Sequence, residues 1–428
     1  MARLFKFIGV LLLLIVLAVV GLFVVAVESY PVVVTSSSEQ VDQAESVKTL
    51  MKQLKASIRN RTHRQNIYIS QAHLNSLVGF AQRAHGKING QVYIDSQSTR
   101  VLASYHLPNN PVGHYLNIDI MLSPGAGIKV DHVKIGPIII PGDLALGSLI
   151  YLANWYTESD IASQFVEQVE SVAMTDGQIQ LSIKPLDKFL KELNDVKQGV
   201  GGGSDEKTRI RTAYYLKQLS LLGVGKRSSP QSLAEYIGPV FSWAKDRSDD
   251  ETAAKENEAA IMALAIFAGH HRFANLVGDV QPLKSRAVRP NFKPRLKNRT
   301  DLNQHFIFSA AIKILSEQGL SLAIGEFKEL MDRSDDGSGF SFVDLAADFA
   351  GVAFAVSATN PASARSVQNI LADSSNEQLF FPVTEDLPEG LSKNEFSQQF
   401  FEVDSPEYLR MVGKINQRIA ELPIHQSP

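Results

Sequence analysis

The chain has 428 residues, enough for two or three domains that each bury a core of their own. With 44% hydrophobic and 20% charged residues, the composition excludes a globally disordered protein. A formal net charge of −3 lacks the basic footprint of a nucleic-acid binder, so we expect no nucleic-acid partner. The absence of cysteine excludes disulfides, thiolate metal ligands and cysteine nucleophiles.

Residues 7–27 form an apolar run of 21 positions without charge or proline. As a helix, this run would span about 30 Å, the thickness of a bilayer's hydrocarbon core. Arg3 and Lys6 precede it and Glu28 follows it, which places residues 1–6 in the cytoplasm as a short tail. The alternative is a cleaved secretory signal, whose apolar region is normally shorter and ends at a small-x-small site. We favour an uncleaved single-pass anchor in the cell inner membrane, with the rest of the chain in the periplasm.

Residues 31–198 alternate between helical and strand patterns. Ser38 can cap a first helix, after which the apolar period changes from about four to two. The period-two runs are residues 66–70, 90–97, 99–108, 115–123, 127–141 and 177–185. Helical patterns cover residues 144–172 and 186–196. We predict an α+β periplasmic domain next to the membrane, with one antiparallel sheet and helices on one of its faces.

Part of this domain is unusually apolar. Ile138, Ile139 and Ile140 precede an apolar helix that includes Leu149 and Trp155. These side chains either belong to the core or line a cavity for a lipid-like molecule, and we favour the core.

A glycine-rich linker, residues 199–204, separates this domain from a C-terminal all-α domain at residues 205–428. Helical patterns in the second domain cover residues 208–222, 233–247, 251–269, 364–373 and 406–422. Seven basic residues and no acidic one lie between Pro282 and Thr300. This stretch either touches anionic lipid headgroups or glycan phosphates, or is a strap that pairs with nearby acidic helices, which is the interpretation we favour.

Ionisable residues recur at helical spacing inside apolar stretches between residues 299 and 351. Charge in such positions costs free energy unless it is paired, hydrogen-bonded or bound to a metal. The candidate catalytic residues are His305, Glu329 and Asp348, and the candidate binding residues are Asp301, Lys328, Asp332 and Asp344. Together they suit an oxygen-rich divalent-metal site or an acid–base pair, although no particular metal is indicated.

Each acid also has a structural explanation. Asp301 can cap a helix, Asp344 can form a capping box with Ser341, and Glu329 can pair with Arg333. Asp348 is the hardest to explain in this way, because it lies past the cap among alanines and leucine. A calcium loop beginning at Asp332 is disfavoured, since its twelfth position is a valine.

The motifs in residues 299–353 resemble the YfiM-type branch of VanZ-like bacterial envelope proteins. They are D-x-x-x-H-F from Asp301, K-E-x-x-D from Lys328, G-S-G-F-S from Gly337 and D-L-A-A-D-F-A-G from Asp344. The resemblance implies a small helical module in the cell envelope, without an assigned activity. Members of that family cross the membrane several times, but charged residues interrupt the helices here and we expect no further span.

These observations lead to two hypotheses about function. The first is an inner-membrane-anchored periplasmic protein that binds or scaffolds in the envelope and handles a lipid or a glycan. The alternative is a metal-assisted hydrolase or transferase acting on such a molecule through His305, Glu329 and Asp348. No Walker motif, H-E-x-x-H or Ser-His-Asp signature supports a more specific enzyme class.

Overall fold

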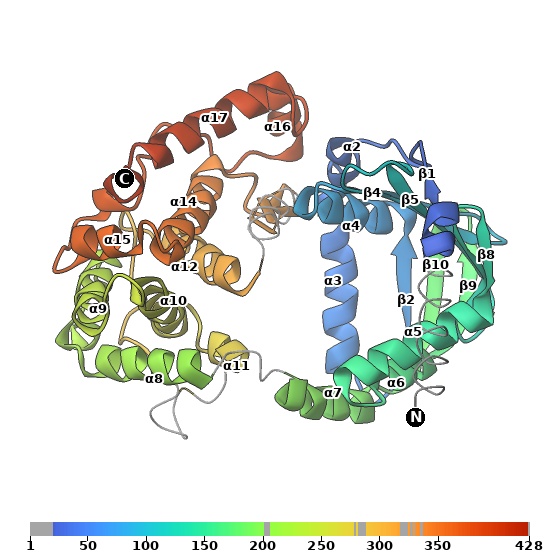
Figure 1. Ribbon diagram of the computed structural model, residues 1–428, viewed down its shortest axis with the longest axis horizontal. Helices are drawn as coiled ribbons and strands as arrows, with labels where there is room; N and C mark the ends of the chain where they lie inside the picture. The colour runs from blue at the N-terminus through green and yellow to red at the C-terminus, as the bar shows by residue number, and fades with distance from the viewer. Residues whose placement is uncertain are drawn as a thin grey trace, which may run out of the picture. The chain divides into compact units, whose positions relative to one another are not determined.

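The computed structural model describes residues 20–200, 206–277, 280, 288–316, 324–325, 328–329, 331–333 and 337–426. The chain divides into two compact units, Met1–Asn194 and Asp195–Pro428, each considered by itself (Figure 1). Most of the expected anchor and most of the expected linker lie outside the described residues. Residues 20–26 of the anchor are helical, and Leu22, Phe23 and Val25 within them are exposed.

The first unit is a mixture of helices and antiparallel sheets, as expected, but it contains two sheets instead of one. The larger sheet has the order β3-β4-β5-β7-β8, with β1 also paired to β5, and the smaller has the order β2-β10-β9-β6. The strands are β1 Val27–Glu28, β2 Gln65–Ser70, β3 Ile88–Ile94, β4 Thr99–His106, β5 Tyr115–Ser123, β6 Gly125–Ala126, β7 Lys129–Ile135, β8 Ile138–Pro141, β9 Val169–Thr175 and β10 Gln178–Ile183.

Besides the helical residues 20–26, the described helices that accompany these sheets are α2 Ser37–Val41, α3 Ala44–Arg59, α4 Gln71–Ala84, α5 Gly142–Thr157, α6 Ile161–Gln168 and α7 Asp187–Val200. The sequence did not indicate α4, which begins at a capping box formed by Ser70 and His73. The expected helical section to residue 172 was too long, because Val169 and Val172 are buried in strand β9. Buried β-branched residues of this kind suit a strand better than a helix.

Helix α5 corrects a second expectation. Leu149 and Trp155 were expected in the core, but they are 65% and 71% exposed. Figure 1 shows α5 and α6 along the outer edge of this unit, close to α7. The core interpretation of this apolar helix is therefore wrong.

The second unit is helical, and in its described part β-structure is confined to isolated bridges such as Phe340↔Leu391. Its helices are α8 Glu206–Leu221, α9 Ala234–Arg247, α10 Ala253–Leu264, α11 Ala274–Val277, α12 Thr300–Leu315, α14 Phe342–Thr359, α15 Ala364–Leu371, α16 Lys393–Phe400 and α17 Pro406–Ala420. Short 3₁₀ turns are η1 Gly223–Lys226, η3 His271–Phe273, η4 Glu377–Leu379 and η5 Pro423–His425, and η2 Ala265–Gly269 is a π-helix.

Helix α14 lies at the centre of this unit, in contact with α10, α12, α15 and α17 (Figure 1). Among the described residues it is the one helix long and apolar enough to cross a membrane. Yet 72% of it is buried against its neighbours, as in the core helix of a folded domain. Its aromatic contacts support the core assignment, since Phe354 packs against Phe306 of α12 with ring centroids 5.3 Å apart.

Helices α12 and α14 approach closely because a glycine lies between them. A Cβ atom added at Gly351 would lie 2.1 Å from the carbonyl oxygen of Phe306, which no side chain can tolerate. The stretch of small residues at Ala346, Ala347, Ala350 and Gly351 therefore permits the near approach of a neighbouring helix.

Substitution of Gly351 by alanine tests this contact. The added methyl group must push α12 away from α14, so we expect G351A to lower the free energy of unfolding of the helical unit by at least about 2 kcal/mol. Trp243 of α9 reports unfolding of this unit in a W155F background.

The matched control is G413A, on the exposed side of α17, where an added Cβ meets nothing within 4 Å. Alanine should stabilise that helix by about 0.5–1 kcal/mol. Equal effects of the two substitutions would contradict a close contact at Gly351.

Candidate functional site

A buried histidine–aspartate pair joins α12 to α14. His305 Nδ1 lies 3.0 Å from Asp348 Oδ2, and the two side chains are 11% and 5% exposed. The Ser309 hydroxyl, one turn along α12, donates to the other Asp348 oxygen over 2.7 Å. On the far side of the imidazole, Nε2 lies 3.6 Å from Asp344 Oδ2. The imidazole is thus held between two carboxylates of α14.

Glu329 joins this pair from residues 328–332. Its side chain is fully buried, and Oε2 accepts a hydrogen bond from the Ser341 backbone N–H over 3.1 Å. The Lys328 ammonium donates to Glu329 Oε1 and to Asp332 Oδ2, each over 2.9 Å. Ser341 also caps α14, since its hydroxyl accepts from the Asp344 N–H. The N-terminus of α14 is therefore tied to Glu329.

Arg299 closes the cluster at the start of α12. Its guanidinium contacts Asp301 Oδ2 at 2.7 Å and Glu389 Oε2 at 2.6 Å, and it lies 3.5 Å from Asp344 Oδ1. The seven residues that the sequence singled out thus form one connected network with Arg299.

The environment shifts the pKa values of these groups in ways that suit proton exchange. Burial lowers the pKa of His305, but the charges of Asp348 and Asp344 outweigh it and raise the value to about 9. Burial raises the pKa of Glu329 to about 7, against the opposing effect of Lys328. Burial also raises the pKa of Asp344. A protonated imidazole and a carboxyl group that titrates near neutrality are therefore neighbours.

A cavity of about 230 Å³ opens beside this network, between α12 and the residues Ile324, Gly325 and Lys328. Asp301, His305, Lys328 and Asp348 supply its polar wall. The rest of the lining includes the apolar side chains of Phe308, Ile312 and Ile324. Along α12 the lining runs from Asp301 and His305 to Phe308 and Ile312, so its charged residues lie toward the start of the helix and its apolar residues toward the end.

The donor set suits a metal ion. His305, Glu329 and Asp348 each offer one ligand atom, and these atoms lie within 4.8 Å of one another. One imidazole and two carboxylates suit ions such as Mn²⁺, Fe²⁺ or Zn²⁺. Ligands about 2.0–2.2 Å from an ion are at most about 4.4 Å apart, so the donors would need to move slightly closer. The residues present therefore fit an ion, provided that Lys328 gives way.

Sequence reasoning missed several contributors. Ser309 follows His305 by four residues and shares its helical face, which was a usable signal. Gly325 could not have been found, because its role is a contact: an added Cβ would lie 2.8 Å from Asp348 Oδ2. Residues 334–336 of the disfavoured calcium loop lie outside the described part of the chain.

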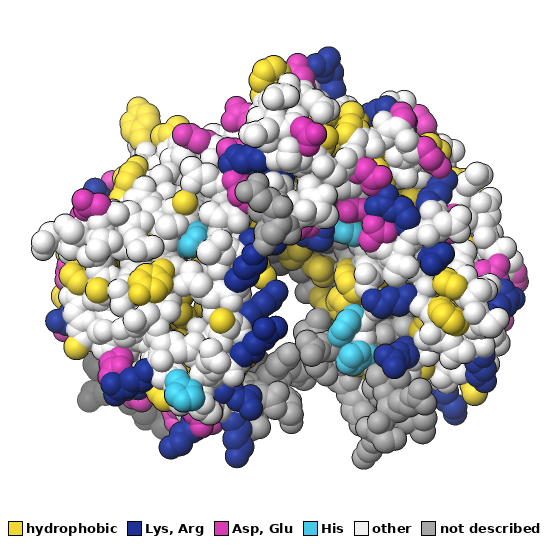
Figure 2. All heavy atoms as spheres, turned by 180° about the vertical axis from the view of Figure 1, so that it is seen from behind, with side chains coloured by type: hydrophobic (Ala, Val, Ile, Leu, Met, Phe, Trp, Pro, Cys, Tyr) yellow, Lys and Arg dark blue, Asp and Glu magenta, His cyan; other side chains and the backbone are white. Residues whose placement is uncertain are grey.

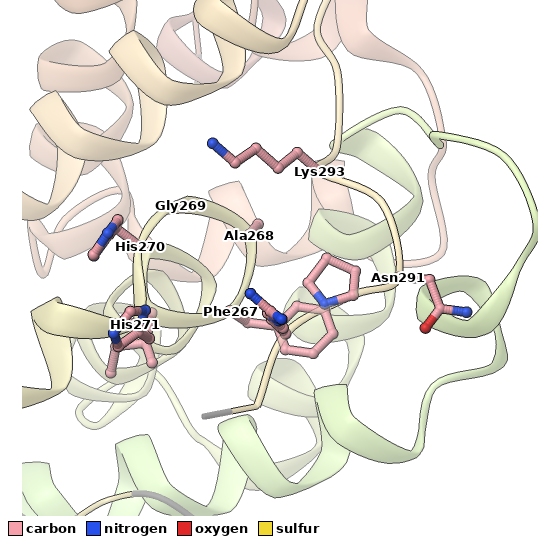
Figure 3. Close-up of a pocket in the computed structure, with 10 residues that line it drawn as sticks. Phe267, Ala268, Gly269, His270, His271, Asn291 and Lys293 are labelled. Carbon is pink, nitrogen blue, oxygen red and sulfur yellow. The ribbon is translucent and has the colours of Figure 1, made fainter. Parts of the chain in front are cut away.

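A second cavity, of about 500 Å³, was not expected from the sequence. The π-helix Ala265–Gly269 forms one wall, with His270 and His271 stacked at its end, 4.6 Å between ring centroids. Figure 3 shows Lys293 extending over Gly269 toward the side on which His270 lies. The π-helix also contacts α12, because Asn303 donates to the Ala268 carbonyl over 3.2 Å.

In the described part of the basic stretch, two residues form ion pairs with acidic residues, as expected for a strap. Lys297 lies 3.1 Å from Glu385, and Arg299 reaches Glu389. These acidic partners belong to the loop before α16, whereas acidic helices had been expected. Elsewhere on the surface, Lys and Arg side chains lie beside Asp and Glu side chains on the face drawn in Figure 2.

Comparison of the chain with protein-family models, with curated proteins and with solved structures returns no match.

The raised pKa of His305 predicts a pH dependence of stability in metal-free protein. A histidine whose pKa rises on folding contributes stability that is complete below about pH 6.5 and is lost as the pH rises through about 9. We expect the melting temperature of the helical unit, followed by Trp243 fluorescence in a W155F background with EDTA, to fall between about pH 7 and 9.5. This fall should be smaller in H305Q. The same pH profile in both proteins would show that His305 is not held protonated.

Proposed function

We propose that the helical unit binds an amphipathic molecule of the cell envelope, with a polar head at His305 and Lys328 and an apolar portion along Phe308, Ile312 and Ile324. The observation that carries this proposal is the two-sided lining of the cavity beside α12. A site with one charged and one apolar end favours ligands of the same character. The cavity has room for a short apolar segment and not for a whole lipid, since about 30 Å³ corresponds to one water molecule.

An envelope location is part of the proposal. The apolar residues 7–27 supply a single-pass anchor in the inner membrane, with both units in the periplasm. The motif resemblance of residues 299–353 to VanZ-like envelope proteins supports the same location. The protein would then act on, or present, lipid or glycan components within reach of the bilayer.

Filling the cavity should block the ligand. We expect I312W, in full-length protein in lipid nanodiscs, to reduce several-fold the crosslinking of a lysophospholipid with a diazirine at its chain end. The readout is mass spectrometry of labelled peptides within residues 301–316. L409W is the matched control, since Leu409 is exposed on α17, away from this cavity. Undiminished labelling of the I312W peptides would contradict binding in the cavity.

A second function is supported by a separate observation, the convergence of His305, Glu329 and Asp348. We propose as the alternative a metal-assisted hydrolase or transferase that acts on an envelope lipid or glycan. A divalent ion at these donors would polarise a phosphoryl or acyl oxygen. Asp348 orients the imidazole through Nδ1 in the metal-free site, and Glu329 would bind the ion as a deprotonated carboxylate.

Lys328 distinguishes the two functions, because its ammonium competes with a metal for Glu329. If an ion binds here, K328M should raise the affinity for Mn²⁺ about threefold or more, and D348N should lower it at least about tenfold. Electron paramagnetic resonance of full-length protein titrated with Mn²⁺ measures both. D386N is the control, since Asp386 is paired with Lys414 and Arg418 on the surface. No Mn²⁺ binding by wild type or K328M would eliminate the metal-dependent enzyme.

A further inference from the structure

Helices α5 and α6 carry an exposed apolar surface that the unit does not cover. Seven large hydrophobic side chains there are each more than half exposed: Leu144, Leu149, Tyr151, Leu152, Trp155, Tyr156 and Phe165. Folded monomers seldom leave a contiguous apolar surface of this kind in water, and such surfaces mark contacts with proteins or membranes.

The sequence of α5 explains how wide this surface is. From Leu144 to Thr157 the helix has no charged residue, and its one charge is Asp143 in the first turn. At about 100° per residue, the exposed large side chains of α5 cover an arc of about 160°. The opposite side of α5 packs against β7 and β8. Almost half of the helix circumference is therefore apolar and uncovered.

The length of α5 decides how it could meet a bilayer. Its 16 residues are about 24 Å long, shorter than the hydrocarbon core, so the helix cannot span it. The corner between α5 and α6 has its own polar groups satisfied, since Asn154 bonds both the Ser163 hydroxyl and the Ala162 N–H. Trp155 and Tyr156 lie at this corner, and such side chains concentrate at the membrane–water boundary.

The described end of the N-terminal helix is fixed to the same part of the unit. The Ala26 carbonyl oxygen packs on Gly136, in the turn between β7 and β8, so closely that an added Cβ would lie 2.3 Å away. Strand β8 ends at Pro141 and α5 begins at Gly142. The exposed apolar end of the expected anchor and the exposed helix α5 are thus joined through one β-hairpin.

We propose that α5 and the α5–α6 corner lie in the plane of the bilayer, at the boundary between headgroups and acyl chains. The lipid surface is the occupant that this face fits, because the face is apolar, uncharged from Leu144 to Thr157, aromatic at one end and continuous with the end of the anchor. The exposed acids Glu158 and Asp160 of the corner follow this run. The contact of α5 with the bilayer depends on insertion of its apolar side chains. We therefore expect α5 to bind zwitterionic lipids as well, and we expect salt not to weaken the contact. The inference rests on the membrane location proposed above, but it is independent of the α12–α14 cluster.

The chain has two tryptophans, which makes the test direct. Full-length W243F retains Trp155 alone and is reconstituted in phosphatidylcholine vesicles with bromines placed near the headgroup end of the acyl chains. Trp155 should lose about half or more of its emission relative to unbrominated vesicles, and it should be shielded from aqueous iodide. If W243F is unstable, the emission of Trp155 can be obtained instead by subtracting the spectrum of W155F from that of the wild type.

Matched variants locate the effect. L149Q/L152Q, on the exposed arc, should restore iodide quenching and remove most of the bromolipid quenching. L54Q/I58Q changes two similarly apolar exposed residues of α3 and should change neither. Flotation of the vesicles reports the anchor separately, so a failed anchor and a solvent-exposed α5 are distinguishable.

Two outcomes would overturn the proposal. Trp155 quenched by iodide and not by bromolipid would place α5 in water. Trp155 shielded from both quenchers would show that protein, either the second unit or another copy of the chain, covers this face.

Discussion

The close contact between α12 and α14 determines the geometry of the charged cluster. Gly351 lets the α14 backbone rest on the carbonyl of Phe306, the residue directly after His305. Asp348 lies three residues before Gly351, almost one turn away on the same side of α14. The backbone contact thus fixes both the separation and the register that bring the imidazole to the carboxylate. The aromatic packing of Phe306 on Phe354 extends the same interface into the core.

The charged cluster keeps carboxylate groups at buried positions, where water cannot solvate them. Glu329 is fully buried and Asp348 nearly so, and each is compensated by hydrogen bonds or cations supplied from other segments. Buried ion pairs of this kind add little to stability compared with apolar packing, because the cost of desolvation is large. Their position beside a cavity therefore favours a role in binding or chemistry over one in holding the fold.

Sequence reasoning identified the cluster because its residues contradict their surroundings: an acid at position 348 among alanines needs a partner. Helical spacing placed Asp301 and His305 on one face, and the cavity lining contains both. Contacts between segments were not accessible in this way. Arg299 bridging to Glu389, and Gly325 against Asp348, depend on packing that no periodicity records. The same limit explains why α5 was wrongly expected in the core. An apolar helix has the same sequence pattern whether it packs against the rest of the chain or against something outside it. This limit also explains why one sheet was predicted instead of two, because the sequence pattern of a strand does not show which other strand it pairs with.

The π-helix at Ala265–Gly269 makes the second unit sensitive to a change in the number of residues at this point of the chain. Its closing bond runs from His270 N–H to the Ala265 carbonyl, so one residue more than an ordinary α-helical turn is accommodated there. Deleting a single residue within it would restore the regular α-helical repeat and remove the wider turn that contacts α12. Gly269 would then leave its place against Phe308, and the Asn303 bond to Ala268 would be broken. A deletion at this point is therefore transmitted to α12 through the contacts of Ala268 and Gly269.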